Sequence, residues 1–282
     1  NDALRNNTTG NRNTSVGHDS LGDCTTGENN TAVGSEAGSL ITTGDGNTAL
    51  GYASLRDGTA ASYNTAIGRA ALLINQANNN TAVGYNAAYS GSTGTQNTAI
   101  GSQSLFSFTT GDMNSCLGYQ SGNNITTGDN NLCLGSGSGR AGSPSGNITT
   151  GDNNVVLGNN SISNLYCADT SISSSDARDK TDVADFTKGL DWIKALRPVT
   201  YRWDRRTWYG TEEEPYGTPD GSKKRQRLHV GFLAQEALAV EQANGYGHNN
   251  DDSLILNLTE DGMSYGMKYE RLVPILVNAI KE

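Results

Sequence analysis

The sequence predicts a mainly β protein in two parts: a parallel β-roll built from 17-residue rungs, followed by a small α+β region that ends in a helix. Three observations predict this fold: a short motif that recurs at a nearly fixed step, a change of composition near residue 160, and an apolar segment at the C-terminus. A period of this size is too short for two helices, so it indicates one small unit stacked on itself.

The recurring motif is Asn-Thr-Ala-Val-Gly, with close variants. Successive copies are 17 residues apart, except for one step of 16 and a last step of 23. The copies begin at Asn13, Asn30, Asn47, Asn64, Asn80, Asn97, Asn114, Asn131 and Asn154. Each unit has too few apolar residues for a core of its own, so the rungs are expected to bury one another. At about 4.8 Å per rung, the stack is a rod roughly 40 Å long.

One rung is represented by residues 80–89. Alternation places Thr81 and Val83 on one face of a short strand, and the small residues between and after them on the other face. The small-residue pair at 87–88 is expected to form a second strand. The Gly that ends the motif indicates a tight bend or a close approach of backbones. The recurring Thr-Thr-Gly-Asp/Glu is typical of a turn whose Gly has a positive φ.

Charge and composition exclude several functions. Residues 1–165 contain no Lys, five Arg and ten acidic residues, a net charge of −5, and residues 166–282 carry −4. An acidic surface on both parts argues against a nucleic-acid partner and against an anionic membrane. No apolar run is long enough to span a bilayer, so no membrane insertion is expected. No cysteine or histidine cluster indicates a metal, and no cofactor is expected.

The four cysteines are Cys24, Cys116, Cys133 and Cys167. Cys116 and Cys133 occupy the same motif position in adjacent rungs. We expect them to be buried, reduced thiols that act as small apolar residues. A disulfide between the two rungs remains an alternative.

Small Ala and Gly at the inner positions leave little width for a core within one chain. We therefore expect several chains to pack their rolls around a common axis. The repeats over about residues 10–160 resemble the head of trimeric autotransporter adhesins, in which three left-handed parallel β-rolls associate side by side. The same repeats occur in phage tail fibres. The resemblance implies a trimeric, left-handed roll.

Residues 1–160 are thus assigned to the rod, 161–174 to a connector and 175–282 to the C-terminal domain. In that domain a helix is expected over residues 185–196, with its first residue as the N-cap and Pro198 as its stop. An aromatic, β-branched strand follows the proline.

Four stretches of the C-terminal domain carry a second resemblance. They are Ser-Asp-Ala-Arg-Asp-Lys at 175–180, Leu-Arg-Pro-Val-Thr-Tyr-Arg-Trp at 196–203, Gly-Phe-Leu-Ala-Gln-Glu at 231–236 and Tyr-Glu-Arg-Leu-Val-Pro-Ile-Leu at 269–276. In this order they closely resemble the intramolecular chaperone auto-processing domain that ends phage tail fibres and tailspikes. That domain also occurs in membrane-bound transcription factors, but those would need a DNA-binding domain where this chain has a β-roll.

The resemblance implies self-cleavage by a serine/lysine pair after trimer assembly. Carried over, the scissile bond is Ser174–Ser175, the nucleophile is Ser175 and the base is Lys180. A serine hydroxyl is a poor nucleophile until a base removes its proton. A lysine in water is protonated at pH 7, so Lys180 must be partly desolvated on assembly to serve as that base. The residues expected to support this pair are Asp176, Arg178, His229, Gln235 and Glu236.

The function expected from both resemblances is that of a phage tail-fibre or tailspike end, located in the virion and folded in the host cytoplasm. It would be a homotrimer that binds a host cell-surface receptor, such as a glycan, and a serine endopeptidase that acts only on itself. Tyr52, Tyr85 and Tyr119 follow the motif Gly in three rungs and are candidate receptor contacts, although packing between chains is the alternative. A cellular trimeric adhesin and a chaperone that does not cleave are the other candidates.

Overall fold

The computed structural model describes all residues except 1, 166–174, 176, 212 and 260–261. The chain divides into two compact units, which are described separately. The solenoid comprises Asn1–Ser161 with Gly210–Gly217, and the C-terminal unit comprises Ile162–Tyr209 with Thr218–Glu282. No helix among the described residues is both long and apolar enough to cross a membrane.

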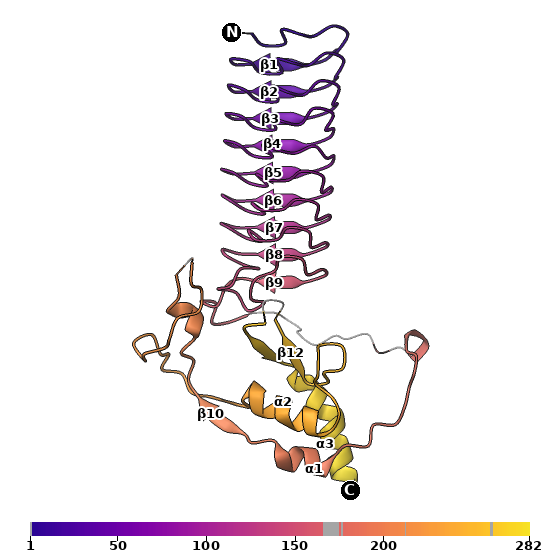
Figure 1. Cartoon of the computed structure of the whole chain (residues 1–282), viewed down its shortest axis with the longest axis vertical. Coiled ribbons are helices and arrows are strands. Elements are labelled where there is room, and N and C mark those ends of the chain that lie inside the picture. Colours follow the sequence, from indigo (N-terminus) through magenta and orange to yellow (C-terminus); the bar gives the residue numbers. More distant parts are fainter. Residues whose placement is uncertain (1, 166–174, 176, 212, 260–261) are drawn as a thin grey trace. The chain divides into compact units, whose positions relative to one another are not determined.

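Nine three-residue strands of the solenoid form one parallel sheet in sequence order, stacked as a column in Figure 1. They are β1 (Thr14–Val16), β2 (Thr31–Val33), β3 (Thr48–Leu50), β4 (Thr65–Ile67), β5 (Thr81–Val83), β6 (Thr98–Ile100), β7 (Ser115–Leu117), β8 (Leu132–Leu134) and β9 (Val155–Leu157). Each motif copy lies in register over the next, as where Thr14 pairs with Thr31. The predicted mainly β fold with 17-residue rungs is confirmed.

Each described rung contains one strand, not the two predicted. In β5 the middle residue, Ala82, is fully buried, while Thr81 and Val83 are half-buried. The small-residue segment that follows is a turn, in which Asn86 and Ala88 have φ values of 52° and 50°. Residues with left-handed φ cannot continue a pleated strand, so the chain bends here.

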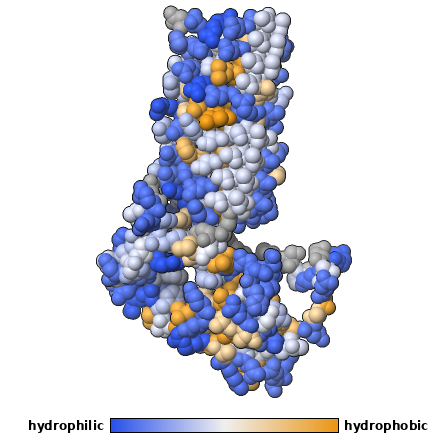
Figure 2. Space-filling view, in the orientation of Figure 1, coloured by the Kyte–Doolittle hydropathy of each residue, from blue (hydrophilic) through white to orange (hydrophobic). Residues whose placement is uncertain are grey.

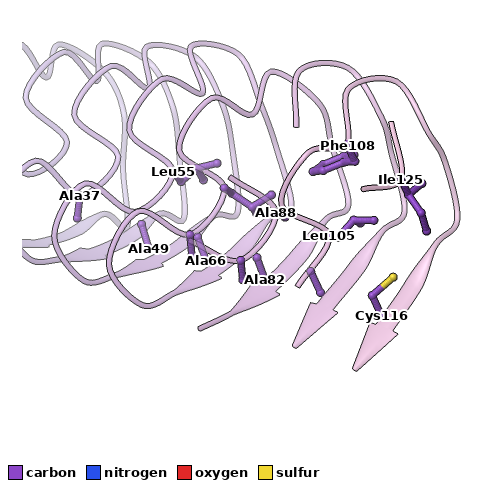
Figure 3. Close-up of a cluster of buried hydrophobic side chains, with 14 of the residues drawn as sticks. Ala37, Ala49, Leu55, Ala66, Ala82, Ala88, Leu105, Phe108, Cys116 and Ile125 are labelled. Atoms are coloured by element: carbon purple, nitrogen blue, oxygen red, sulfur yellow. The ribbon is translucent and has the colours of Figure 1, made fainter. Parts of the chain in front are cut away.

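The solenoid core is a narrow column of small and branched side chains, shown in Figure 3. Each strand contributes its middle residue, such as Ala49 or Ala66, and the turns contribute larger ones such as Leu55. Phe108 is fully buried and fits because Gly91 lacks a side chain; a Cβ there would lie 1.9 Å from the Phe108 ring. Packing between rungs therefore replaces a core within each rung.

The Asn that opens each motif forms a buried ladder along the solenoid. The Asn64 Oδ1 accepts a hydrogen bond from the Asn80 backbone N at 2.9 Å. The Asn64 Nδ2 donates to the Ala77 carbonyl at 2.9 Å and to the Asn47 Oδ1 at 3.2 Å. A strand of three residues leaves many backbone groups without a ladder partner, and these side chains satisfy them.

The glycines of the turns serve a different purpose from the predicted one. The Gly of Thr-Thr-Gly does not have positive φ; the left-handed residue lies two positions later, as at Asn29 with φ 58°. Gly27 is required because a Cβ there would lie 2.5 Å from the Gly44 carbonyl oxygen of the next rung. The Gly that ends the motif combines both reasons: Gly34 has φ 136°, and its Cβ would lie 2.6 Å from the Gly51 oxygen.

Cys116 and Cys133 are buried and free, as predicted, and so is Cys24, for which no prediction was made. Cys116 and Cys133 are register partners in β7 and β8. Cys167 lies outside the described residues.

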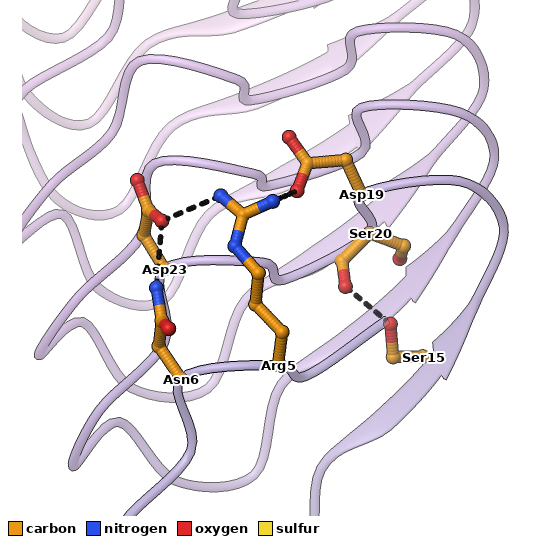
Figure 4. Close-up of polar contacts among 6 residues, drawn as sticks. All are labelled: Arg5, Asn6, Ser15, Asp19, Ser20 and Asp23. Carbon is orange, nitrogen blue, oxygen red and sulfur yellow. Dashed lines mark hydrogen bonds and ion pairs between the residues drawn. The ribbon is translucent and has the colours of Figure 1, made fainter. Parts of the chain in front are cut away.

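Residues before β1 are held on the first rung by polar contacts, shown in Figure 4. The Arg5 guanidinium contacts Asp19 at 2.5 Å and Asp23 at 2.9 Å. Asn6 donates to the same Asp23 carboxylate at 3.0 Å. The side chains of Arg5 and Asn6 thus extend the rung-to-rung contacts in front of β1.

The third residue of each strand forms a continuous line on the outer surface, which we call the aliphatic row. Its members are Val16, Val33, Leu50, Ile67, Val83, Ile100, Leu117, Leu134 and Leu157. Five of them are exposed, led by Val16 at 58%. Figure 2 shows a few apolar patches on the mainly hydrophilic surface of the solenoid.

The C-terminal unit packs helices and two antiparallel strand pairs around one core. Its elements are α1 (Leu190–Ala195), β10 (Val199–Tyr201) paired with β11 (His229–Gly231), α2 (Ala234–Ala243), β12 (Leu256–Leu258) paired with β13 (Tyr265–Met267), and α3 (Leu272–Lys281). The buried hydrophobic residues of this core are Trp192, Leu196, Ala237, Ile255, Leu256, Leu272 and Ile275. The predicted α+β region ending in a helix is confirmed.

The helix predicted over residues 185–196 is wrong at its N-terminal end, because α1 begins at Leu190. Phe186 precedes the helix and packs its ring 5.8 Å from that of Trp192, which draws the preceding segment away from a helical path. No side chain of the segment caps α1; the carboxylate of Glu282 accepts a hydrogen bond from the Leu190 N at 3.0 Å instead. An acidic group from the chain's end therefore satisfies the helix N-terminus.

Candidate functional site

A single 3-10 turn, Ala177–Asp179, brings Ser175 and Lys180 together. The backbone N of Lys180 donates to the Ala177 carbonyl at 3.3 Å and closes the turn. The Lys180 Nζ then lies 2.7 Å from the Ser175 Oγ. This distance is within the reach that a base needs to take a proton from a hydroxyl.

Both side chains of this pair are exposed in the single chain. The Lys180 Nζ donates this hydrogen bond to the Ser175 hydroxyl oxygen. Catalysis by the pair requires the reverse, an amine that accepts the serine proton. Water must therefore be excluded from Ser175 and Lys180 before the pair can act as nucleophile and base.

The neighbours of the pair are only partly described. Ser174 and Asp176 lie outside the described residues. Arg178 lies within the 3-10 turn, and its side chain is exposed.

Three of the four stretches that carried the second resemblance meet in the C-terminal unit. The strands β10 and β11 pair Val199 with Gly231. Arg197, just before β10, donates from its Nε to the Glu236 carboxylate of α2 at 3.1 Å, and this hydrogen bond raises the pKa of Arg197. The hydroxyl of Tyr269 accepts a hydrogen bond from the Phe232 N at 3.1 Å. The ordered motifs thus build one packed scaffold.

His229 and Gln235, predicted to support the pair, belong to this scaffold. The His229 ring stacks on Tyr201 with centroids 5.5 Å apart and lies 6.3 Å from the Trp203 ring. Gln235 is exposed on α2. Within the described residues, the contacts of His229 are those of a packed aromatic residue of the β10–β11 pair, and none of them joins it to Ser175.

The candidate receptor contacts lie on the solenoid surface, as the motif spacing predicts. Tyr52, Tyr85 and Tyr119 are 47%, 46% and 53% exposed. Arg69 occupies the same position in the rung between Tyr52 and Tyr85, and its guanidinium lies over both rings. The sequence interpretation considered only the tyrosines and missed this arginine, although its place after a motif Gly is visible in the repeat.

A buried carboxylate in the C-terminal unit was also missed. Glu241 of α2 is fully buried and accepts hydrogen bonds from the Ser253 Oγ at 2.9 Å, the Leu254 N at 2.9 Å and the Ile255 N at 2.5 Å. These bonds hold the turn that leads into β12. Its position four residues after the buried Ala237 was the available signal, because such residues share a helix face.

One comparison with known proteins matches the segment that contains Ser175 and Lys180. Residues 175–246 match the model of a peptidase family described as the chaperone of endosialidase, and the match begins at Ser175. No curated protein and no solved structure matches the chain. The family model covers the segment with the serine and lysine and the β10–β11–α2 scaffold, so this region is similar to an intramolecular chaperone of the self-cleaving peptidase type.

Proposed function

We propose that this chain is the distal part of a phage tail fibre or tailspike. Its solenoid is a trimeric rod for host attachment, and residues 175–282 first assist folding of the trimer and then cut the chain before Ser175. The observation that carries this proposal is the 2.7 Å contact between the Lys180 Nζ and the Ser175 Oγ, at the start of the matched family segment.

The cut proceeds by attack of the Ser175 hydroxyl on the carbonyl carbon of the preceding residue, Ser174. A C–O bond forms and the C–N bond breaks, while Lys180 takes the hydroxyl proton and the released α-amino group of Ser175 gains one. Water then hydrolyses the resulting ester and restores the hydroxyl. The reaction needs no cofactor, and it happens once per chain because the substrate bond belongs to the enzyme.

Assembly supplies the dry environment that the exposed pair lacks. The aliphatic row offers nine apolar side chains in one line along the solenoid. A line of apolar side chains of which five are exposed is the kind of surface that marks an interaction site. Two further copies of the same chain are its natural occupants, because their rows have the same length and spacing. α3 is also amphipathic, and Val273 and Ile280 are 56% and 83% exposed on it.

The exposure of the serine and lysine also supports an alternative, a chaperone that does not cut the chain. Because Ser175 and Lys180 are exposed, a trimer that failed to cover them would chaperone folding without cutting. This version of the protein would keep the rod joined to its C-terminal domain in the virion.

A self-cleaving and a non-cleaving chaperone are distinguished by comparing the purified wild-type protein with the Ser175→Ala variant by denaturing gel and intact mass. We expect the wild-type trimer to yield fragments 1–174 and 175–282 and the variant to stay whole, with both proteins trimeric by light scattering. Lys180→Met and Lys180→Arg should also stay whole, since a guanidinium does not give up its proton. Full cleavage of the Ser175→Ala trimer would contradict the proposed nucleophile.

A further inference from the structure

Three side chains on consecutive rungs of the solenoid form an aromatic–cation–aromatic stack. Their rungs are aligned by backbone hydrogen bonds: the Tyr52 carbonyl accepts from Ala70, and the Arg69 carbonyl accepts from Asn86. The Arg69 Cζ lies 5.7 Å from the centroid of the Tyr52 ring and 5.6 Å from that of Tyr85. The guanidinium is thus covered on both sides by rings, an arrangement that favours the cation and fixes its plane.

The charge of Arg69 is not neutralised within the described residues. Its guanidinium makes no hydrogen bond and no ion pair there, although the solenoid is acidic overall. Arg56, on the same side of the solenoid, shows the contrast, since its Nε contacts Asp57 at 2.7 Å. Arg69 therefore presents N–H donors that can bind an anion.

The stack borders a hollow of about 380 Å³. Its lining also includes Tyr89 and Phe106, whose rings stack 5.1 Å apart, and Leu73. A hollow of this size can hold a single sugar ring or a short saccharide.

We propose that this hollow binds a saccharide that carries a carboxylate. The apolar C–H faces of a sugar ring pack on the tyrosine rings, and the hydroxyls remain in water or bond to the phenols. The carboxylate takes the planar, two-donor edge of Arg69. This proposal rests on the attachment role proposed above. It specifies that the receptor is an acidic glycan.

Tyr119 occupies the same motif position as Tyr52 and Tyr85 and supplies a matched control. It follows the motif Gly as Tyr52 and Tyr85 do and is 53% exposed, but Ser102 separates it from Tyr85 and it does not line the hollow. Substitution of Tyr119 thus removes an equivalent exposed ring without touching the site.

The test uses the purified trimer on an array of saccharides that contain uronic or nonulosonic acids, each paired with its methyl ester. We expect the acids to bind at least tenfold more tightly than the esters in calorimetry. Arg69→Gln should lose this preference and Arg69→Lys should keep part of it. Tyr52→Ala should weaken binding of acid and ester alike, and Tyr119→Ala should bind as wild type.

The proposal is overturned if the trimer retains no acid of the array, if acid and ester bind equally, or if Arg69→Gln binds as wild type. It is also overturned if Tyr52→Ala and Arg69→Gln dissociate the trimer, because the stack then serves packing between chains. Trimer mass and self-cleavage, measured on the same wild-type samples, report on the proposed function independently of any saccharide.

Discussion

The solenoid and the C-terminal unit are stabilised in opposite ways. In the solenoid, hydrogen bonds mainly join neighbouring rungs, as in the contact of Asn64 with Asn47. In the C-terminal unit, bonds join residues far apart in sequence, such as Leu190 and Glu282, separated by 92 positions. A stack of identical rungs has no preferred starting point and can slip by one rung, whereas a unique core has one arrangement. The difference gives a physical reason for attaching a chaperone to the rod.

The largest difference between the two regions is expected when one large buried ring is truncated in each of them. Phe108→Ala in the solenoid and Trp192→Ala in the C-terminal unit should each cost about 3–5 kcal/mol of folding free energy locally. Because the proposed self-cleavage is assigned to residues of the C-terminal unit, Trp192→Ala should reduce self-cleavage strongly, while Phe108→Ala should lower the melting temperature of the rod. Gel analysis and calorimetry measure the two effects. Equal loss of cleavage in both variants at low temperature would show that the regions do not fold separately.

The asparagine ladder can be tested by comparing its middle with its end. Asn64→Ala leaves the Asn80 N and the Ala77 carbonyl without their partner inside the solenoid, a loss of about 2–4 kcal/mol. Asn13 is half-buried and makes the same type of contact at the first rung, where water can replace it, so Asn13→Ala should cost at most about 1 kcal/mol. Denaturant unfolding of the two variants gives the difference. Similar losses would contradict a cooperative ladder.

The smallest expected effect is a loss of rod stability at alkaline pH. Burial raises the pKa of the Cys24 thiol above its usual value of 9.0. The folded state therefore holds the proton to higher pH than the unfolded state. The stabilisation is complete below the ordinary pKa and is lost as pH rises through the interval up to the raised pKa, by about 1.4 kcal/mol for each unit of difference.

This effect is measured as the slope of the rod's melting temperature between neutral and alkaline pH. Cys24→Ala should flatten the slope, because the variant has no thiol to ionise at this position. An unchanged slope in the variant would assign the alkaline loss to other groups.

The sequence predicted the rod more completely than it predicted the site. A fixed period and a Gly at each motif end are sufficient for a stacked parallel sheet, since every rung repeats the same constraint. The role of the motif Asn was missed because it depends on a carbonyl about 14 residues away, as where Asn30 donates to Gly44. The start of α1 was missed because Glu282 and Phe186, and not a local N-cap, set it.

The serine and lysine of the candidate site were named through a resemblance, and the pattern of residues alone would not have singled them out. A serine followed five residues later by a lysine is common in proteins, and only the turn between them shows that Ser175 and Lys180 meet. Arg69 was missed because its place after a motif Gly, although visible in the repeat, does not show that its guanidinium lies over the rings of Tyr52 and Tyr85. Each of these two sites depends on a contact between side chains that the sequence pattern does not specify.

Self-cleavage of the assembled chain before Ser175 can be followed by intact mass spectrometry of freshly purified wild-type protein over time. We expect a fragment whose new N-terminus is Ser-Asp-Ala-Arg, formed with a first-order rate constant that does not change on tenfold dilution while the trimer persists. A well-assembled trimer whose chains remain uncut, or a cut at any other bond, would contradict it.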